Sequence, residues 1–140
     1  MTTLLQPYLF FGGRADEAID FYQCALGAKL VMRMRFKDNP DGTSPVALAD
    51  KVMHARLDIG GATLLLSDGH NQDGPNFAGF SLTLSVASDA EVDRFIEALG
   101  EDGAVVQAPQ KTFFSSRFAM VKDRFGVLWI LLVEAAAGQN

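Results

Sequence analysis

The sequence PYLFFGGRADEAIDFYQCALGAKL, residues 7–30, decides the fold, because its pattern occurs a second time in the chain. Shifted by 73 positions, Ala25-Leu26-Gly27 coincides with Ala98-Leu99-Gly100. The further matches, which need no gap, are Leu9 with Leu82, Asp16 with Asp89, Ile19 with Val92, Asp20 with Asp93 and Tyr22 with Phe95. A unit of this length that occurs only twice indicates two copies of one module, neither of which closes a core alone. We therefore expect the functional site where the two copies face each other.

Each copy predicts a strand followed by an amphipathic helix. Residues 8–11 and 80–86 are short aromatic or β-branched runs bounded by glycine or polar residues, which favours strands. Apolar residues then recur at helical spacing, as Ala15, Ala18, Ile19, Tyr22 and Leu26 in the first copy and as Val92, Phe95, Ile96 and Leu99 in the second. Ser88 and Glu91 have the spacing of a capping box. We expect Gly27 and Gly100 to end the helices in the left-handed conformation.

Two hairpins complete the modules. Residues 54–59 and 62–67 flank the turn Gly60-Gly61, and residues 116–121 pair with 127–134 across 122–126. Gly61 corresponds to Gly126 at an offset of 65, so the second module is the shorter one. Residues 29–36 and 104–107 supply the remaining strands. The first of these carries Arg33 and Arg35, either on an ordinary solvated sheet face or at the rim of an anion-binding cavity.

These elements predict an α+β fold of two βαβββ modules. We expect the 140 residues to form a single domain, with a first module over residues 1–68, a linker over 69–79 and a second module over 80–134. His70, in the polar and glycine-rich linker, is expected to lie in solvent. The small and polar residues from Ala135 onward are expected to fray.

Composition excludes several classes of function. The net charge of −5 and the scattered basic residues argue against a nucleic-acid partner. The single cysteine, Cys24, permits no intrachain disulfide, and on the first helix it is expected to be a packed thiol. Neither a signal peptide nor an apolar run long enough to cross a bilayer is evident. The expectation is a cytoplasmic protein with no membrane association.

The duplicated unit, with DFYQCALGAKL in the first copy and VKDRFGVLWILLVE at the end, resembles the vicinal oxygen chelate superfamily of glyoxalase I, bleomycin-resistance proteins and extradiol dioxygenases. The segments PYLFFGGRADEAIDFY, HARLDIGGATLLLSD and DRFGVLWILL are most similar to its PhnB-like branch, which is often described as demethylubiquinone methyltransferase-like. The resemblance implies an incompletely closed mixed β-barrel, a ligand in the barrel cavity and a homodimer, with modules paired within one chain or exchanged between two.

In the enzymes of this superfamily, four side chains from the first and last strands of the modules hold a divalent metal. The resemblance places those positions at Tyr8, Leu65, Ser81 and Ile130. None is a histidine or carboxylate, and leucine and isoleucine offer no metal ligand. A slip of one or two residues would bring in Gln6, Ser67 or Asp68, but all four strands would have to shift consistently to yield a site. We expect no metal and no cofactor. Methyl transfer is also disfavoured, since Gly12-Gly13 is not a nucleoside-binding glycine fingerprint.

A cavity without a metal would be apolar and aromatic with a few polar anchors. The candidate lining residues are Tyr8, Phe10, His54, Arg56, Ser81, Phe113, Phe114 and Trp129. His54 could serve as a general base or hydrogen-bond donor if it faces the cavity, and otherwise is a surface or interface histidine. Trp129, in a nearly continuous apolar strand, is more simply explained by packing in the core or at a dimer interface.

Three hypotheses about function follow. The first is a module that binds a small apolar or aromatic molecule without transforming it. The second is a metal-dependent lyase, isomerase or dioxygenase of the vicinal oxygen chelate type. The third is a fold that serves only assembly. The metal content of the protein and the chemistry of the four inward positions distinguish the first two.

Overall fold

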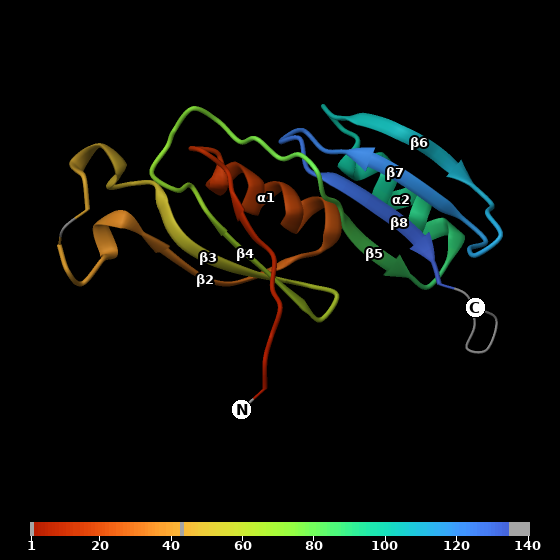
Figure 1. The fold of residues 1–140 in the computed structure, drawn as a ribbon, viewed down its shortest axis with the longest axis horizontal. Coiled ribbons are helices and arrows are strands. Elements are labelled where there is room, and N and C mark those ends of the chain that lie inside the picture. The colour runs from red at the N-terminus through yellow and green to blue at the C-terminus, as the bar shows by residue number, and fades with distance from the viewer. Residues whose placement is uncertain (1, 43, 135–140) are drawn as a thin grey trace. The chain divides into compact units, whose positions relative to one another are not determined.

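The computed structural model describes residues 2–42 and 44–134, which form two compact units divided between Asn76 and Phe77. Each unit contains one long helix and one four-stranded mixed sheet, in the order β-α-β-β-β (Figure 1). The α+β class and the two βαβββ modules are therefore confirmed. The expectation that the chain frays from Ala135 concerns residues outside the described ranges.

The first unit contains five regular elements and two short 3-10 turns. The regular elements are β1 (Tyr8–Phe10), α1 (Ala15–Leu26), β2 (Lys29–Arg35), β3 (Val52–Ile59) and β4 (Ala62–Ser67). The 3-10 turns, η1 (Phe36–Asp38) and η2 (Val46–Leu48), lie between β2 and β3. The strand order is β1-β4-β3-β2, in which only β1 and β4 are parallel.

One face of the first sheet is covered by α1, which contacts β2 and β3 (Figure 1). Side chains that alternate toward this face are buried, among them Leu9 on β1, Leu57 on β3 and Leu66 on β4. Because successive residues of a strand point to opposite faces, their neighbours lie on the other side of the sheet. We call that side the open face; it carries Tyr8, Phe10, His54, Arg56 and Leu65.

The second unit repeats this topology. It contains β5 (Leu82–Val86), α2 (Asp89–Leu99), β6 (Ala104–Gln110), β7 (Phe118–Lys122) and β8 (Leu128–Val133), with the strand order β5-β8-β7-β6. Only β5 and β8 are parallel. The core lies between α2 and the sheet, where Val92, Leu99, Val121, Trp129 and Leu131 are almost fully buried.

The ends of the helices differ from the prediction at one glycine. Gly27 ends α1 with φ 68°, in the left-handed conformation that was expected, but Gly100 follows α2 with φ −77°. Glycine is required at position 100 for space, because a Cβ there would lie 2.9 Å from the carbonyl oxygen of Ile96. The positive φ comes two residues later, at Asp102. Ser88 caps α2 as predicted, since its Oγ accepts from the Glu91 N–H at 3.3 Å.

Two further expectations concern single side chains. Cys24 is exposed on α1, so the prediction of a packed thiol was wrong. The helix turns its buried stripe, which includes Ile19 and Tyr22, toward the sheet, and position 24 falls outside that stripe. His70 is exposed, as predicted, and its ring meets that of Phe36 edge to face at 5.4 Å.

Candidate functional site

The open face of the first sheet presents two adjacent aromatic side chains. Along β1, Leu9 is 3% exposed, whereas Tyr8 and Phe10 are 40% and 56% exposed. Their rings stack at a centroid distance of 5.1 Å and an interplanar angle of 28°. Adjacent exposed apolar side chains can mark a binding or interaction site. The pair forms what we call the aromatic ledge, Tyr8 and Phe10.

His54 completes the ledge from a distant part of the sequence. The Tyr8 hydroxyl lies 2.9 Å from His54 Nδ1, although 46 residues separate the two in the chain. Their ring centroids are 5.5 Å apart. Either the phenol donates to Nδ1, or a protonated Nδ1 donates to the phenol oxygen, depending on the tautomer. The pair can therefore offer a ligand an acceptor or a donor from the same position.

The environment keeps the Tyr8 hydroxyl protonated. Partial burial raises the pKa of Tyr8 above its ordinary value, and the Ser67 side chain offsets only part of this effect. A neutral phenol at physiological pH is a hydrogen-bond donor as well as an acceptor. The ledge thus combines apolar ring surface with one uncharged polar group.

Strand register places the remaining open-face residues beside the ledge. Leu65 on β4 lies between Tyr8 on β1 and Arg56 on β3. Arg56 Nε is 3.7 Å from the carboxylate of Asp58, and both side chains remain more than 40% exposed. Four of the residues predicted from sequence are therefore brought together on one sheet: Tyr8, Phe10, His54 and Arg56.

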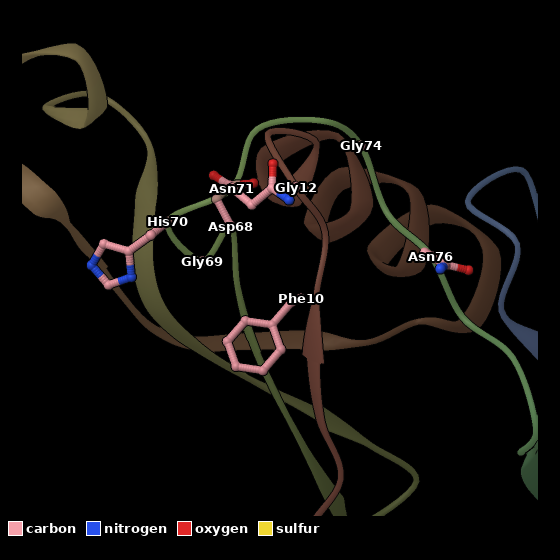
Figure 2. Close-up of a pocket in the computed structure, with 8 residues that line it drawn as sticks. All are labelled: Phe10, Gly12, Asp68, Gly69, His70, Asn71, Gly74 and Asn76. Atoms are coloured by element: carbon pink, nitrogen blue, oxygen red, sulfur yellow. The ribbon is translucent and has the colours of Figure 1, made fainter.

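A pocket of about 300 Å³ adjoins the ledge (Figure 2). The ring of Phe10 lies beneath a loop that leaves β4 and arches over the connection from β1 to α1, with His70 and Asn76 at opposite ends of that loop in Figure 2. The lining residues are Phe10, Gly12, Asp68, Gly69, His70, Asn71, Gly74 and Asn76. Except for Phe10, sequence reasoning did not identify them, because a polar glycine-rich stretch is more typical of a linker.

Asp68 holds this region together. Its side chain is 2% exposed and accepts hydrogen bonds from the backbone N–H groups of Gly13, Ala15 and Val52, each at 2.8 Å. Two of these donors lie at the start of α1, where backbone N–H groups lack helical partners and the helix dipole favours negative charge. The carboxylate therefore acts as a cap supplied by tertiary structure. A polar residue directly after an apolar strand was the only sequence signal for it.

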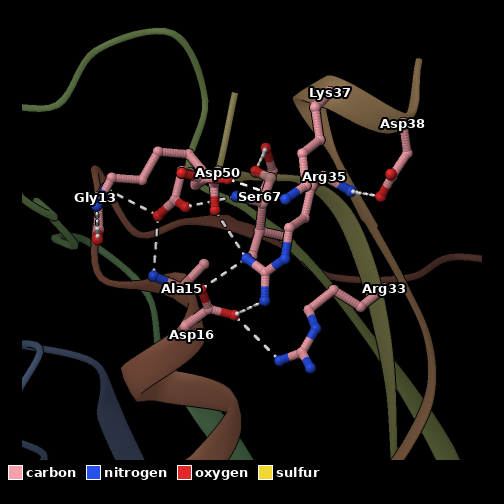
Figure 3. Close-up of polar contacts among 12 residues, drawn as sticks. Gly13, Ala15, Asp16, Arg33, Arg35, Lys37, Asp38, Asp50 and Ser67 are labelled. Atoms are coloured by element: carbon pink, nitrogen blue, oxygen red, sulfur yellow. Dashed lines mark hydrogen bonds and ion pairs between the residues drawn. The ribbon is translucent and has the colours of Figure 1, made fainter. Parts of the chain in front are cut away.

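Arg33 and Arg35 form ion pairs within the first unit (Figure 3). Both pair with the carboxylate of Asp16 on α1, at 3.0 and 2.8 Å, and Arg35 also donates to the Asp50 carbonyl at 2.8 Å. The hydrogen bond from Arg35 to Asp16 raises the pKa of the guanidinium further. Lys37 in turn lowers the pKa of Asp50 through a 3.0 Å ion pair. These arginines tie β2 to α1, which gives them a structural role.

In the second unit, Trp129 belongs to the core. Its side chain is 2% exposed, and Nε1 donates to Asp123 Oδ2 at 2.8 Å. The same carboxylate accepts from the N–H groups of Phe125 and Val127 at 2.9 and 3.0 Å. The buried Asp123 thus closes the turn between β7 and β8 and anchors the indole.

The other candidates of the second unit lie nearer its surface. Ser81 directly precedes β5 and is partly exposed. Phe113 is fully exposed, and Phe114 is 40% exposed. The Phe114 ring meets those of Phe113 and Phe118 edge to face, at 5.1 and 5.4 Å. These rings form a small aromatic cluster at the start of β7.

The side chains at the four positions that the resemblance assigns to metal ligands do not fit a metal ion. Tyr8 and Leu65 are cross-strand neighbours on the first open face, and Ile130 pairs with Thr83 on the second sheet. The hydrocarbon side chains of Leu65 and Ile130 have no lone pair to donate. Within residues 2–42 and 44–134, no group of three His, Cys, Asp or Glu side chains is placed to hold a metal.

Comparison with known proteins assigns the family. The model of the glyoxalase/bleomycin resistance protein/dioxygenase superfamily matches residues 4–131. The chain belongs to this superfamily. The Escherichia coli protein YjdN is 32% identical to this chain over 138 residues, covering 92% of this chain and 94% of that protein.

Two solved structures are similar to this protein over nearly the whole chain. Protein PA1353 from Pseudomonas aeruginosa is 38% identical, with a TM-score of 0.83, covering 95% of this chain and 98% of that one. The PhnB protein from Bacillus cereus, described as a putative 3-demethylubiquinone-9 3-methyltransferase, is 26% identical, with a TM-score of 0.75, covering 94% and 99%. The PhnB-like resemblance is thereby confirmed.

No helix in the described part of the chain combines the length and the apolar character needed to cross a bilayer. The cytoplasmic location stays a prediction.

Proposed function

We propose that this superfamily member binds a small aromatic or apolar molecule on the open face of its first sheet, without the help of a metal ion. The observation that carries the proposal is the aromatic ledge with the Tyr8–His54 hydrogen bond of 2.9 Å. Ring surface that is about half exposed favours a planar ligand, because stacking removes apolar area on both partners from water. The ligand site combines this surface with one polar anchor, the usual composition of a small-molecule pocket.

The polar anchor selects among aromatic ligands. Because the Tyr8–His54 pair exists in two tautomeric arrangements, it accepts a hydrogen bond from a ligand hydroxyl or donates one to a ligand carbonyl. Leu65 and Phe10 beside it exclude water from part of the contact, which strengthens that hydrogen bond. A ring that carries a single hydroxyl or carbonyl group is the best match.

The alternative within the superfamily is a metal-dependent lyase, isomerase or dioxygenase. It requires donor side chains that positions 65 and 130 do not supply. Methyl transfer has equally little support, because backbone groups of the Gly12-Gly13 turn are already hydrogen-bonded within the protein. The Gly12 carbonyl accepts from Gly74 N–H, and the Gly13 N–H donates to Asp68, so this turn offers no cradle for a nucleoside cofactor.

A thermal-shift titration with β-naphthol tests the proposal. A ligand that binds only the folded state stabilises it by RT ln(1 + [L]/Kd) and so raises the melting temperature. Phe10→Ala should abolish the shift, and Tyr8→Phe should weaken affinity by about fivefold to tenfold, the usual effect of one lost hydrogen bond. Val46→Ala, which removes an apolar side chain that is 92% exposed in the same unit, is the matched control. Equal shifts for wild type and Phe10→Ala would overturn the proposal.

The metal content of the protein distinguishes metal-free ligand binding from the metal-dependent enzyme. After dialysis against a chelator, affinity for β-naphthol should be unchanged, and elemental analysis should find no stoichiometric divalent ion. One tightly bound ion per chain, together with loss of ligand binding on chelation, would favour the metal-dependent alternative. If neither ligands nor metals bind, the assembly hypothesis is left.

The proposal includes association of two chains. Several large apolar side chains remain exposed, with Leu5 at 99% and Phe113 at 101% the most extreme. Such side chains are typical of interfaces when they gather in patches. Sedimentation equilibrium should give twice the chain mass of 15.1 kDa. A monomer at micromolar concentration would contradict this part.

A further inference from the structure

The pocket beside Phe10 has walls whose positions are fixed by backbone contacts. Gly74 N–H donates to the Gly12 carbonyl at 3.1 Å, and a Cβ on Gly12 would lie 2.5 Å from the Gly74 backbone. Two main chains therefore touch at this point, as only glycine permits. A Cβ on Gly69 would lie 3.2 Å from the Phe10 ring. The loop over residues 69–76 rests directly on the ledge, and the pocket is preformed.

Some hydrogen-bonding groups of the loop are used internally. The Gly69 carbonyl accepts from the Gln72 side chain at 3.3 Å, and Asn71 Oδ1 accepts from Asp73 N–H at 2.9 Å. Within residues 2–42 and 44–134, the side chains of His70 and Asn76 make no hydrogen bond. Both line the pocket. They supply hydrogen-bonding groups that a ligand can use.

The charge of the pocket disfavours anions. Its one charged lining residue is Asp68. The Asp68 carboxylate accepts hydrogen bonds from the N–H groups of Gly13 and Ala15 at the start of α1. That place would otherwise suit a phosphate or carboxylate. Lys51 donates to the Gly13 carbonyl at 3.2 Å and is not among the lining residues. The protein's own carboxylate therefore occupies the anion position and repels a second negative charge.

We propose that this pocket is a polar subsite that accepts an uncharged hydrogen-bonding substituent, such as a carboxamide, on the aromatic ligand of the ledge. The inference rests on the proposed function, because Phe10 serves both places: its ring stacks on Tyr8 at 5.1 Å and lines the pocket. A ligand that reaches both is a planar ring with a neutral polar arm. The subsite discriminates against the same ring with a carboxylate or phosphate arm.

Isothermal titration with two probes of equal shape tests the subsite. β-Naphthamide and β-naphthoate share one ring system and differ in the charge of the arm. The amide should bind about tenfold more tightly than the carboxylate, since desolvating an unpaired carboxylate beside Asp68 is unfavourable. Equal affinities, or a preference for the carboxylate, would overturn the inference.

The variant Asn76→Ala locates the discriminating contact. Asn76 is exposed and makes no hydrogen bond within the described residues, so its removal should leave folding unchanged. It should weaken naphthamide binding by about fivefold, the value of one net hydrogen bond, and leave naphthoate binding unchanged. The control is Gln23→Ala, which removes an exposed amide from α1 of the same unit. An unaltered naphthamide affinity in Asn76→Ala would contradict the subsite.

Phe10→Ala separates this inference from the proposed function. If both probes bind wild type equally and Phe10→Ala weakens both, the ledge binds aromatic rings and the subsite is wrong. If neither probe binds wild type, or if Phe10→Ala changes neither affinity, the proposed function fails and the subsite fails with it. The supporting result is a preference for the amide that falls from about tenfold to about twofold in Asn76→Ala, and a loss of both probes in Phe10→Ala.

Discussion

The two modules share one topology but use their buried aspartates at different places. In the first module, Asp68 follows β4 and binds three backbone N–H groups from the start of α1 and of β3. In the second, Asp123 sits in the turn between β7 and β8 and binds two turn N–H groups and the Trp129 indole. Both carboxylates are at most 3% exposed. A repeated backbone fold therefore does not repeat its polar interior.

The difference extends to the helix starts. Arg14 precedes α1 and provides no side-chain cap. In the first module the cap is the carboxylate of Asp68, 53 residues beyond Ala15. Ser88 caps α2 locally, three residues from its bonding partner. Because α2 is capped locally, no residue after β8, the counterpart of β4, is needed to cap it. The first module instead connects its helix, β4 and the pocket loop through a single carboxylate.

Removal of the Asp68 carboxylate should cause the largest loss of stability. Asp68→Ala leaves three backbone N–H groups without an acceptor, two of them in buried surroundings. Since a buried donor left unsatisfied costs about 1–3 kcal/mol, the free energy of unfolding should fall by roughly 3 kcal/mol or more. Urea denaturation followed by circular dichroism measures it. A loss below about 1 kcal/mol would mean that water replaces the carboxylate.

Loss of the Trp129–Asp123 hydrogen bond should cause the second largest loss of stability. Trp129→Phe removes the indole N–H and some buried volume, and leaves Asp123 Oδ2 without that donor. We expect a loss of about 2 kcal/mol in the free energy of unfolding. A double-mutant cycle with Asp123→Ala isolates the coupling between the two side chains. A coupling near zero would show that only packing matters at this position.

The local cap of α2 should matter less than the tertiary cap of α1. Ser88→Ala removes one acceptor at the exposed helix start, and caps of this kind are worth about 1 kcal/mol. Ser88→Asp is the matched control, because it retains an acceptor and adds favourable charge at the helix start. If Ser88→Ala were as damaging as Asp68→Ala, the proposed contrast between the modules would fail.

Each helix also forms partly exposed ion pairs with arginines on or directly beside a strand of its sheet. Asp16 of α1 pairs with Arg33 and Arg35, and Asp93 of α2 pairs with Arg117 at 2.7 Å. Asp16→Asn and Asp93→Asn should each lower stability by about 1 kcal/mol or less, because exposed pairs are weak. Asp16→Asn should have the larger effect, since two arginines lose their partner. The free energy of unfolding of both variants, measured at low and high salt, tests this expectation. The difference between the two variants should shrink in high salt.

The smallest effect concerns the hydroxyl of Tyr8, whose repeat counterpart in the second module is Ser81. Burial raises the folded-state pKa of Tyr8 above 10.0, so the folded state holds the proton more tightly than the unfolded state. This contribution is fully present below pH 10 and is lost as the pH rises through the folded-state pKa. Stability of wild type should decline more steeply above pH 10 than that of Tyr8→Phe. Parallel pH profiles of the two proteins would contradict the raised pKa.

The periodicity of the sequence was enough to predict most of the backbone. The repeat identified both helices, and the Gly60-Gly61 and Gly126 turns identified both hairpins, since these signals lie within a few residues of one another. At the first predicted strand, over residues 8–11, the structure buries Phe11 and leaves Phe10 at the surface. The resemblance also placed Tyr8 and Leu65 at matching positions, and they are register partners.

The sequence by itself determined the two modules, their strand and helix periods and the non-ligating chemistry of Leu65 and Ile130, because these follow from residue identity and local spacing. Only the tertiary structure decided that Tyr8 meets His54 and that Asp68 reaches the start of α1. Those contacts join residues 46 and 53 positions apart, where no periodic signal acts. Their partners are chosen by sheet register and by the close approach of Gly12 and Gly74, which exist only once the chain has packed.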